Sequence, residues 1–183
     1  MDALLEANRC IQCRTPFCQT GKKTGVDVVG GCPVGLRIPE FIEAFRCGDI
    51  RLAYQILDED NPLHPITARV CPQDEQCQAT CTLCSRGAIG IGLLERIVGD
   101  LHAELFGSKK REGGPELSPD RDFPIALIGS GPASLTAAIL LVRKGYRHIH
   151  IFEAFHETTG VLRYGIPPFR LPRTVLEGII RDI

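Results

Sequence analysis

The cysteines constrain this chain more than any other feature. The 183-residue sequence contains nine of them, and all lie at or before Cys84. They make up less of the chain than the ~8–10% typical of a disulfide scaffold, and their number is odd. A reducing compartment would also keep ordinary disulfides open. This segregation predicts an N-terminal module that depends on cysteine chemistry, followed by a module of different chemistry.

The spacing of the cysteines favours iron–sulfur clusters. Two groups each contain a Cys-Pro step: Cys10, Cys13, Cys18 and Cys32, and then Cys71, Cys77, Cys81 and Cys84. Tight spacings let one loop wrap a cluster, and in bacterial ferredoxins the Cys-Pro cysteine ligates the other cluster, so order along the chain does not assign ligands. Zinc is the alternative, because two Cys-x2-Cys pairs exist, but zinc would leave several thiols unused. The chain would then be a zinc-stabilised interaction module without enzymatic activity. Buried structural cysteines are the third interpretation.

Overall composition excludes several classes of protein. With 44% hydrophobic and 23% charged residues, the chain is an ordinary globular sequence. A net charge of −1 gives no electrostatic reason to bind nucleic acid or an anionic membrane. The apolar runs are far shorter than the ~20 residues that span a bilayer, and the first residues are acidic where a signal peptide needs a basic start. We therefore expect a cytoplasmic protein with no nucleic-acid or membrane partner.

Local signals predict a mostly helical first domain over residues 1–106. They indicate helices at 2–8, 40–47, 50–57, 73–84 and 92–106, and no strand before residue 120. A polar linker rich in glycine and proline follows at 107–123, the usual composition of a domain boundary. Residues 124–183 form the second domain. Cys47 lies on an apolar helical stretch, so we expect a buried core thiol there.

The second domain begins with a dinucleotide-binding pattern. A strand from Pro124 leads into a glycine turn, and a helix and a second strand ending at Glu153 follow. Gly129 allows the sharp turn, Gly131 lets the backbone approach a pyrophosphate, and Ser134 occupies the third, small position. The acid comes about 20 residues later, where a ribose hydroxyl would be bound. The alternative is a Rossmann-like turn that holds nothing.

The residues after Glu153 resemble the FAD-binding half of two-dinucleotide flavoproteins. A small-residue turn follows this acid at Thr159 and Gly160, although that turn is usually Gly-Gly. Threonine can take this place if its backbone φ is negative, but its side chain crowds the approach.

Longer runs of sequence resemble one family of iron–sulfur flavoproteins. They are Arg9–Cys18, Gly31–Ile42, Arg69–Cys77, Ile91–Arg96 and Tyr164–Pro172. These runs are most similar to the small (beta) subunit of NADPH-dependent glutamate synthase. The same module resembles the N-terminal part of dihydropyrimidine dehydrogenase and the large subunit of NADH-dependent ferredoxin:NADP oxidoreductases. The main departure is about ten extra residues, Gly21–Gly30, for which we expect a surface loop.

The resemblance implies ligands for two [4Fe-4S] clusters. One cluster would take Cys10, Cys13, Cys18 and Cys81, and the other Cys32, Cys71, Cys77 and a non-cysteine ligand, Glu95. An oxygen ligand is harder than a thiolate and would tune the reduction potential of its cluster. The alternative for Glu95 is a solvated carboxylate on a helix surface. Cys84 has no counterpart in the family pattern and is either spare or a substitute ligand.

The resemblance also implies a flavin site. Its contacts would be Gly129, Ser130, Gly131, Pro132, Ala133 and Ser134 at the pyrophosphate, Glu153 at the ribose, Gly160 and Val161 at the turn, and Arg170. An arginine beside a dinucleotide can pair with phosphate in a bidentate way. Tyr164 and Phe169 are equally compatible with a place in the core.

By the same resemblance, the chain is part of an NAD(P)H-dependent oxidoreductase. The implied fold is an α-helical two-cluster ferredoxin-like domain followed by the start of an α/β Rossmann-type FAD-binding domain. Electrons would pass from NADPH through FAD and the clusters to a partner's redox centre, in a larger catalytic subunit or a ferredoxin-type protein. We expect the NADPH site to lie beyond residue 183, no catalytic acid–base residue in this stretch, and no NADPH turnover by these residues alone.

Overall fold

The computed structural model describes residues 2–107 and 122–181. Two compact units are present, Met1–Leu105 and Phe106–Ile183. Most of the predicted linker, residues 108–121, lies outside the described residues. In the described ranges, none of the helices combines the length and the apolar composition that a membrane crossing requires.

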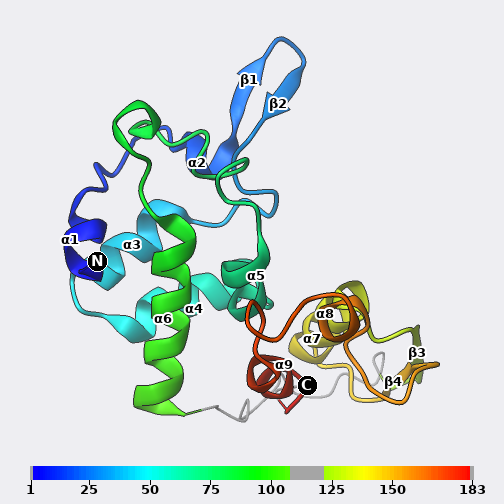
Figure 1. The fold of residues 1–183 in the computed structure, drawn as a ribbon. Helices are drawn as coiled ribbons and strands as arrows, with labels where there is room; N and C mark the ends of the chain where they lie inside the picture. The colour runs from blue at the N-terminus through cyan, green and yellow to red at the C-terminus, as the bar shows by residue number, and fades with distance from the viewer. Residues whose placement is uncertain (1, 108–121, 182–183) are drawn as a thin grey trace. The chain divides into compact units, whose positions relative to one another are not determined.

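The N-terminal unit is built mostly from helices (Figure 1). They are α1 (Ala3–Asn8), α2 (Phe17–Thr20), α3 (Ile38–Arg46), α4 (Ile50–Asp60), α5 (His64–Val70) and α6 (Ile91–Phe106), with a 3-10 turn η1 (Cys84–Arg86). Two aspartates cap helix N-termini, because Asp2 accepts a hydrogen bond from the Leu4 N–H at 3.0 Å and Asp49 accepts one from Leu52 at 2.9 Å. The predicted helix at 92–106 is confirmed within one residue.

The core of this unit brings α3, α4 and α6 together. Phe41 and Ile42 of α3, Leu57 of α4, and Leu94 and Val98 of α6 are all fully buried. The buried residues of each helix recur at helical spacing, so each helix presents one mainly apolar face to the core. Several cysteines belong to this same cluster or pack against it: Cys77 and Cys81 are buried, and Cys10, Cys18 and Cys32 are partly buried. The helical core therefore supports the cysteine-bearing loops directly.

The helix predicted over residues 73–84 is wrong. The chain there forms a succession of turns that ends in η1. Its polar groups are engaged by distant parts of the chain: the Gln76 carbonyl accepts from the Gly31 N–H at 3.2 Å, and the Thr80 hydroxyl donates to the Phe17 carbonyl at 2.8 Å. These tertiary hydrogen bonds take the place of a regular helical ladder.

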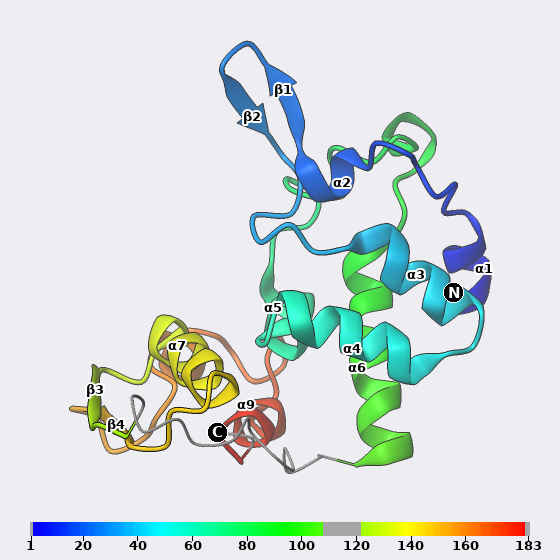
Figure 2. The same cartoon turned by 180° about the vertical axis from the view of Figure 1, so that it is seen from behind.

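The expectation of no strand before residue 120 is also wrong. The extra segment after Cys18 forms an antiparallel hairpin of β1 (Lys22–Thr24) and β2 (Asp27–Val29), with Lys22 opposite Val29. All strand residues are exposed, and the hairpin projects from the helices of this unit (Figures 1 and 2). Its surface position agrees with the expected surface loop, but its backbone is paired.

The second unit begins with a strand–helix–strand arrangement. Its elements are β3 (Ile125–Ile128), α7 (Pro132–Arg143), β4 (Ile149–Phe152), α8 (Val161–Tyr164) and α9 (Arg173–Arg181). The two strands are parallel, with Ile125 opposite Ile149 and Ile128 opposite Phe152. Parallel strands need a crossover connection, and α7 supplies it. The glycine turn between β3 and α7 and the acid after β4 therefore lie at the carboxyl ends of paired strands.

Candidate iron–sulfur and dinucleotide sites

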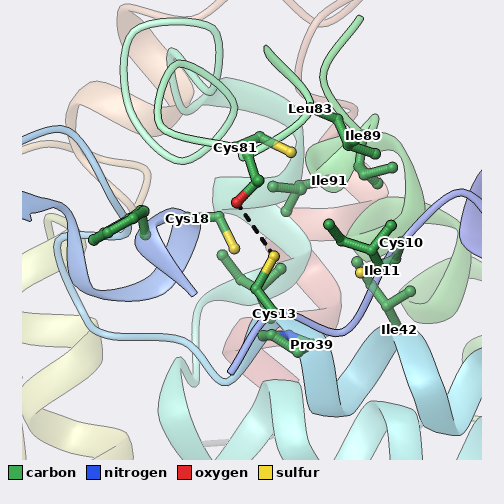
Figure 3. A pocket seen from close by; sticks show the side chains of 13 residues that line it. Cys10, Ile11, Cys13, Cys18, Pro39, Ile42, Cys81, Leu83, Ile89 and Ile91 are labelled. Atoms are coloured by element: carbon green, nitrogen blue, oxygen red, sulfur yellow. Dashed lines mark hydrogen bonds between the residues drawn. The ribbon is translucent and has the colours of Figure 1, made fainter. Parts of the chain in front are cut away.

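The first predicted ligand set lines a single cavity. Cys10, Cys13, Cys18 and Cys81 surround a hollow of about 380 Å³, a volume that includes space open to solvent (Figure 3). Cys10 and Cys13 lie in the loop after α1, Cys18 lies on α2, and Cys81 comes from the turns before η1. Apolar side chains from α3 and α6, including Ile42 and Ile91, complete the wall. Two stretches far apart in sequence, Cys10–Cys18 and the turns that carry Cys81, therefore deliver thiols to one apolar site.

The thiols of this first set influence one another electrostatically. Burial raises the pKa of Cys18 to about 12, and Cys81, Cys10 and Cys13 add to the rise. Burial also raises the pKa of Cys10, with further contributions from Cys13 and Cys81. Several thiolates can share such a site only if a cation offsets their charge, and the iron of a cluster supplies one. The donor set therefore fits an iron–sulfur cluster.

The loop between Cys10 and Cys13 has an unusual backbone. Gln12 has a φ of +50°, in the left-handed region that non-glycine residues seldom occupy. Its side-chain amide donates to the Cys10 sulfur at 3.7 Å. The Cys13 sulfur is hydrogen-bonded to the Thr82 hydroxyl at 3.2 Å (Figure 3). Strained backbone of this kind concentrates at ligand sites, where the surroundings hold it in place.

The second predicted set also comes together. Burial raises the pKa of Cys77 to about 12, and the nearby Cys32 and Glu95 add to the rise. Burial likewise raises the pKa of Cys71, with Glu95 and Cys32 contributing next. Cys32 follows the hairpin, Cys71 ends α5, Cys77 lies in the turns, and Glu95 is on α6. Four separate segments thus place three thiols and a carboxyl group within electrostatic reach of one another.

Glu95 is not a solvated surface carboxylate. It is only 6% exposed and lies on the buried face of α6. Burial raises its pKa to about 8, and a hydrogen bond from Thr67 opposes part of that rise. The Thr67 hydroxyl lies 3.3 Å from Oε1. A buried carboxylate is costly unless it is paired or bound to a metal, so an iron site beside the cysteines fits this residue.

Hydrogen bonds at the base of the hairpin hold Cys32 in position. The Cys32 N–H donates to the Gln19 carbonyl at 3.2 Å. The preceding Gly31 N–H lies 3.2 Å from the Gln76 carbonyl and 3.1 Å from the Thr80 hydroxyl. Because β1 and β2 pair, the two ends of the hairpin lie next to each other. The extra residues therefore do not separate Cys18 from the turns that carry Cys77 and Cys81.

The two remaining cysteines lie outside these sets. Cys47 was expected to be a buried core thiol, and that prediction is wrong, because it is exposed at the C-terminal end of α3. The apolar face of α3 consists of Phe41, Ile42 and Phe45, and Cys47 comes after that face ends, with its thiol 3.7 Å from a Glu43 oxygen. Cys84 is exposed at the start of η1.

Within residues 2–107 and 122–181, no three His, Cys, Asp or Glu side chains converge as ligands of a single metal ion.

In the second unit, hydrogen bonds join three predicted flavin-binding segments. Glu153 Oε2 accepts from the Ser130 N–H at 2.9 Å and from the Ser130 hydroxyl, and its Oε1 accepts from the Phe155 N–H at 3.0 Å. The Ser130 hydroxyl in turn accepts from the Thr159 N–H at 2.9 Å. The hydroxyl of Ser130 is the main reason that the pKa of Glu153 falls to about 2, with the backbone N–H groups adding to it. Glu153 is therefore ionised, and a carboxylate with about four acceptor positions keeps capacity for a further donor.

The two small-residue turns of this unit meet. Gly129 has a φ of +81°, and a side chain at Gly131 would find no atom within 4 Å. Gly160 has a φ of +53°, and a Cβ there would lie 3.2 Å from the Gly131 Cα. The open space beside Gly131 is what close approach of a pyrophosphate to the backbone requires. The turn geometry fits a dinucleotide.

Thr159 does not meet the condition of a negative backbone φ. Its φ is +81°, and the residue is fully buried. Within the described part of the chain, its hydroxyl has no hydrogen-bond partner. The hydrogen bond from its N–H to Ser130 and the close contact of Gly160 with Gly131 hold the turn in this conformation.

The other predicted flavin contacts flank these turns. Pro132 begins α7, and the first helical hydrogen bond runs from Leu135 to the Gly131 carbonyl at 3.0 Å, so the N–H groups of Ala133 and Ser134 lie in the open first turn. Val161 begins α8 and is exposed, as is Arg170. Tyr164 and Phe169 are also exposed, so neither belongs to the core of the described chain.

Sequence reasoning missed three residues that shape the sites. Thr67 and Thr82 contact predicted ligands, and nothing in their local sequence marks them. Glu6 is 5% exposed and accepts from Arg9 at 2.8 Å and from the Gly90 N–H at 2.7 Å, which ties α1 to the start of α6. The spacing of Glu6 and Arg9 along α1 is visible in the sequence, but the partnership with Gly90 depends on the tertiary fold.

Comparison with known proteins identifies the class of domain that these sites define. Residues 1–105 match the family described as dihydropyrimidine dehydrogenase domain II, 4Fe-4S cluster. The chain belongs to this family of 4Fe-4S cluster domains. The resemblance inferred from the sequence runs is thereby confirmed.

Several characterised relatives match over nearly the whole chain. The glutamate synthase [NADPH] small chain of Azospirillum brasilense is 34% identical over 178 residues, covering 96% of this chain and 34% of that protein. The NAD-dependent dihydropyrimidine dehydrogenase subunit PreT of Escherichia coli K12 is 34% identical over 182 residues, covering 99% of this chain and 40% of that protein. The putative oxidoreductase AegA of Escherichia coli K12 is 35% identical over 174 residues, covering 93% of this chain and 24% of that protein. These relatives are oxidoreductases, and the chain spans about a third of the length of the first of them.

Proposed function

We propose that this chain is the electron-transfer portion of a longer NAD(P)H-dependent iron–sulfur flavoprotein, most like the glutamate synthase small subunit. The observation that carries the proposal is the sorting of seven cysteines and one buried glutamate into two groups of four. The family match to a 4Fe-4S domain supports the identity of the bound group.

Each group would hold one [4Fe-4S] cluster. Cys10, Cys13, Cys18 and Cys81, which share a cavity, would ligate the first cluster. Cys32, Cys71, Cys77 and Glu95, which influence one another electrostatically, would ligate the second. Ligands of the two sets alternate along the chain. Each cluster would therefore join cysteine-bearing loops that lie far apart in the sequence and that α3 and α6 do not hold together by themselves.

The second unit would hold the pyrophosphate and ribose of FAD. Gly131 leaves room at the backbone, the first-turn N–H groups of Ala133 and Ser134 would donate to phosphate, and Glu153 would accept from a ribose hydroxyl. Gly160 and Val161 would form the second turn of the site. The exposed Arg170 would pair with phosphate.

When bound, a flavin would link two-electron nicotinamide chemistry to the one-electron chemistry of the clusters. The residues described here would position these groups; none is proposed as a proton donor or acceptor in catalysis. We propose that the nicotinamide site lies outside these residues and that the electrons go to a larger catalytic subunit or a ferredoxin-type protein. The names of the relatives support this assignment, since two of them are a small chain and a subunit.

The ligand sets are tested by electron paramagnetic resonance of the reduced 183-residue chain, purified without oxygen. Wild-type protein should contain iron and acid-labile sulfide and should show two cluster signals. Cys81→Ala should lose the same signal as Cys13→Ala, although 68 positions separate the two cysteines in the sequence. Cys77→Ala should lose the other signal.

Cys47→Ala is the matched control, since this exposed cysteine belongs to neither set and its loss should leave both signals intact. Loss of different signals in the Cys13 and Cys81 variants would refute the proposed ligand sets. Zinc without iron or sulfide in the purified chain would refute the clusters altogether.

A further inference from the structure

A short chain of side-chain hydrogen bonds ends on Glu95. The Thr67 hydroxyl on α5 lies 3.3 Å from Glu95 Oε1 on α6. The same hydroxyl accepts a hydrogen bond from the Asn61 side-chain amide at 2.7 Å. Asn61 follows α4, so three successive helices contribute one residue each to the series Asn61–Thr67–Glu95.

The far end of this series is firmly held. The Asn61 side-chain oxygen accepts from the Leu63 N–H at 3.2 Å, which directs the amide nitrogen toward Thr67. The Asn61 backbone donates to the Leu57 carbonyl at 2.9 Å and accepts from the His64 N–H at 2.9 Å. Asn61 therefore has a fixed backbone and a fixed amide orientation.

The hydrogen bond from Asn61 decides how Thr67 uses its own proton. A hydroxyl has one proton to donate, and an N–H from Asn61 already occupies one of its acceptor positions. The possible acceptors are Glu95 at 3.3 Å and the Leu63 and His64 carbonyls, each at 3.4 Å. As the iron ligand proposed above, Glu95 would be ionised, and its carboxylate is then the stronger acceptor because hydrogen bonds to ionised groups are stronger than those between neutral groups. The Thr67 proton is thus directed at Glu95.

Resting on the function proposed above, we propose that Asn61 and Thr67 are positioning residues for Glu95 as a cluster ligand. They hold Oε1 in a defined hydrogen bond and leave the second oxygen as the donor atom for iron. Residues that hydrogen-bond a metal ligand fix its orientation and tune the metal, and losing one typically lowers metal affinity about 10–100-fold.

The direction of the effect follows from charge. A hydrogen bond from Thr67 withdraws negative charge from the carboxylate, so Glu95 donates less electron density to iron. Without that bond, the ligand becomes a stronger donor and the oxidised cluster is favoured, which makes the reduction potential more negative. Glu95 would also rotate more freely, so iron would be lost faster from this cluster.

Three substitutions test the series in the anaerobically purified chain. Thr67→Val keeps the shape of the side chain but removes the hydroxyl. Thr67→Ser keeps the hydroxyl and should rescue the wild-type behaviour. Asn61→Asp keeps the acceptor for Leu63 but replaces the amide donor with a second acceptor, so the Thr67 proton should turn away from Glu95.

The readout is a redox titration of each variant followed by electron paramagnetic resonance, with the rate of iron loss to a chelator as the second measurement. Thr67→Val and Asn61→Asp should shift the signal assigned to the Cys77 set to a more negative potential. They should also speed iron loss from that cluster by about 10-fold or more. Thr67→Ser should match the wild type, and the signal assigned to the Cys81 set should not move in any variant.

Thr136→Val is the matched control. It makes the same chemical change at a half-buried helical threonine whose hydroxyl donates to the Pro132 carbonyl of its own helix at 2.8 Å. It should leave both potentials unchanged. Equal shifts of both clusters in Thr67→Val would indicate general destabilisation and would overturn the inference.

The proposed function and this inference fail in different ways. If the wild-type chain lacks a second cluster, both are overturned. If the second cluster is present but Glu95→Ala leaves its potential and iron content unchanged, Glu95 is not a ligand. If Glu95→Ala changes them and Thr67→Val does not, Glu95 remains a ligand and only the positioning role is refuted.

Discussion

Replacing Gly31 with alanine should damage the fold at the base of the hairpin and disturb the site that contains Cys32. Gly31 has a φ of +79°, and a Cβ there would lie 2.3 Å from the Gly21 nitrogen and 2.7 Å from its Cα. Both are backbone atoms, so no flexible side chain can move aside. The backbone segments around Gly21 and Gly31, which meet at the base of the hairpin, would have to move apart.

The magnitude can be worked from these contacts. A left-handed conformation costs a residue with a Cβ about 1–2 kcal/mol. Separation of the base also weakens the hydrogen bonds from the Gly31 N–H to Gln76 and Thr80, at 3.2 and 3.1 Å. Each is worth about 0.5–1.5 kcal/mol. Gly31→Ala should therefore destabilise the chain by about 2–5 kcal/mol.

Gly25→Ala is the matched control in the same hairpin. Gly25 has a φ of +67°, so it carries the same conformational cost, but a Cβ there meets no atom within 4 Å. Urea unfolding followed by circular dichroism should place Gly31→Ala about 1–3 kcal/mol below Gly25→Ala. Iron content should fall in Gly31→Ala alone, because Cys32 is the next residue. Unfolding free energies equal within 0.5 kcal/mol and full iron content in both variants would refute this reasoning.

Three further predictions concern the bound groups and the two buried side chains with unusual surroundings. Anaerobic removal of iron with a chelator should cooperatively lower the helical circular dichroism of the chain, since metal-binding free energy contributes to folding when the site joins distant segments; an unchanged melting curve would show that core packing suffices. Burial alone would raise the pKa of Glu6, but the hydrogen bonds from Arg9 and Gly90 outweigh it and hold the pKa below its ordinary value. The stabilisation is therefore fully present above the ordinary carboxyl pKa and is lost as the pH falls through the lowered pKa. The free energy of unfolding in urea should fall on acidification in the wild type, and it should fall less in Glu6→Gln. Identical pH profiles of the two proteins would count against this prediction. Thr159→Gly should raise the thermal midpoint, because it relieves left-handed strain of about 1–2 kcal/mol and removes a buried hydroxyl without a partner in the described residues; a lower midpoint would show that the threonine side chain contributes packing that outweighs its strain.

The sequence by itself determined the features that depend on composition and on short-range order. The segregation of the cysteines before Cys84 indicated a cluster-binding module, and the family match confirms it. The helix at 92–106 could be predicted because its apolar residues, Leu93, Leu94, Ile97, Leu101 and Leu105, recur at the helical period. This spacing is visible in the local sequence without help from the rest of the chain. The glycine turn after β3 was also readable, because glycine adopts a positive φ such as that of Gly129 without the steric cost that a Cβ brings.

Features that depend on contacts between distant residues were decided by the tertiary structure. Residues 73–84 were predicted as a helix, but hydrogen bonds from Gly31 and to Phe17 hold them in turns. Cys47 was expected in the core, but it lies just past the buried face of α3. Thr159 has a positive φ that no local signal indicated, and its contacts with the glycine turn hold it there.

The surroundings of Glu95 show the same division most clearly. Its position on a helix follows from local periodicity, whereas its burial and its hydrogen bond to Thr67 follow from how α5 packs against α6. Hydrogen bonds and burial between distant segments leave no periodic trace in the sequence, because the residues that form them are brought together only when the chain folds.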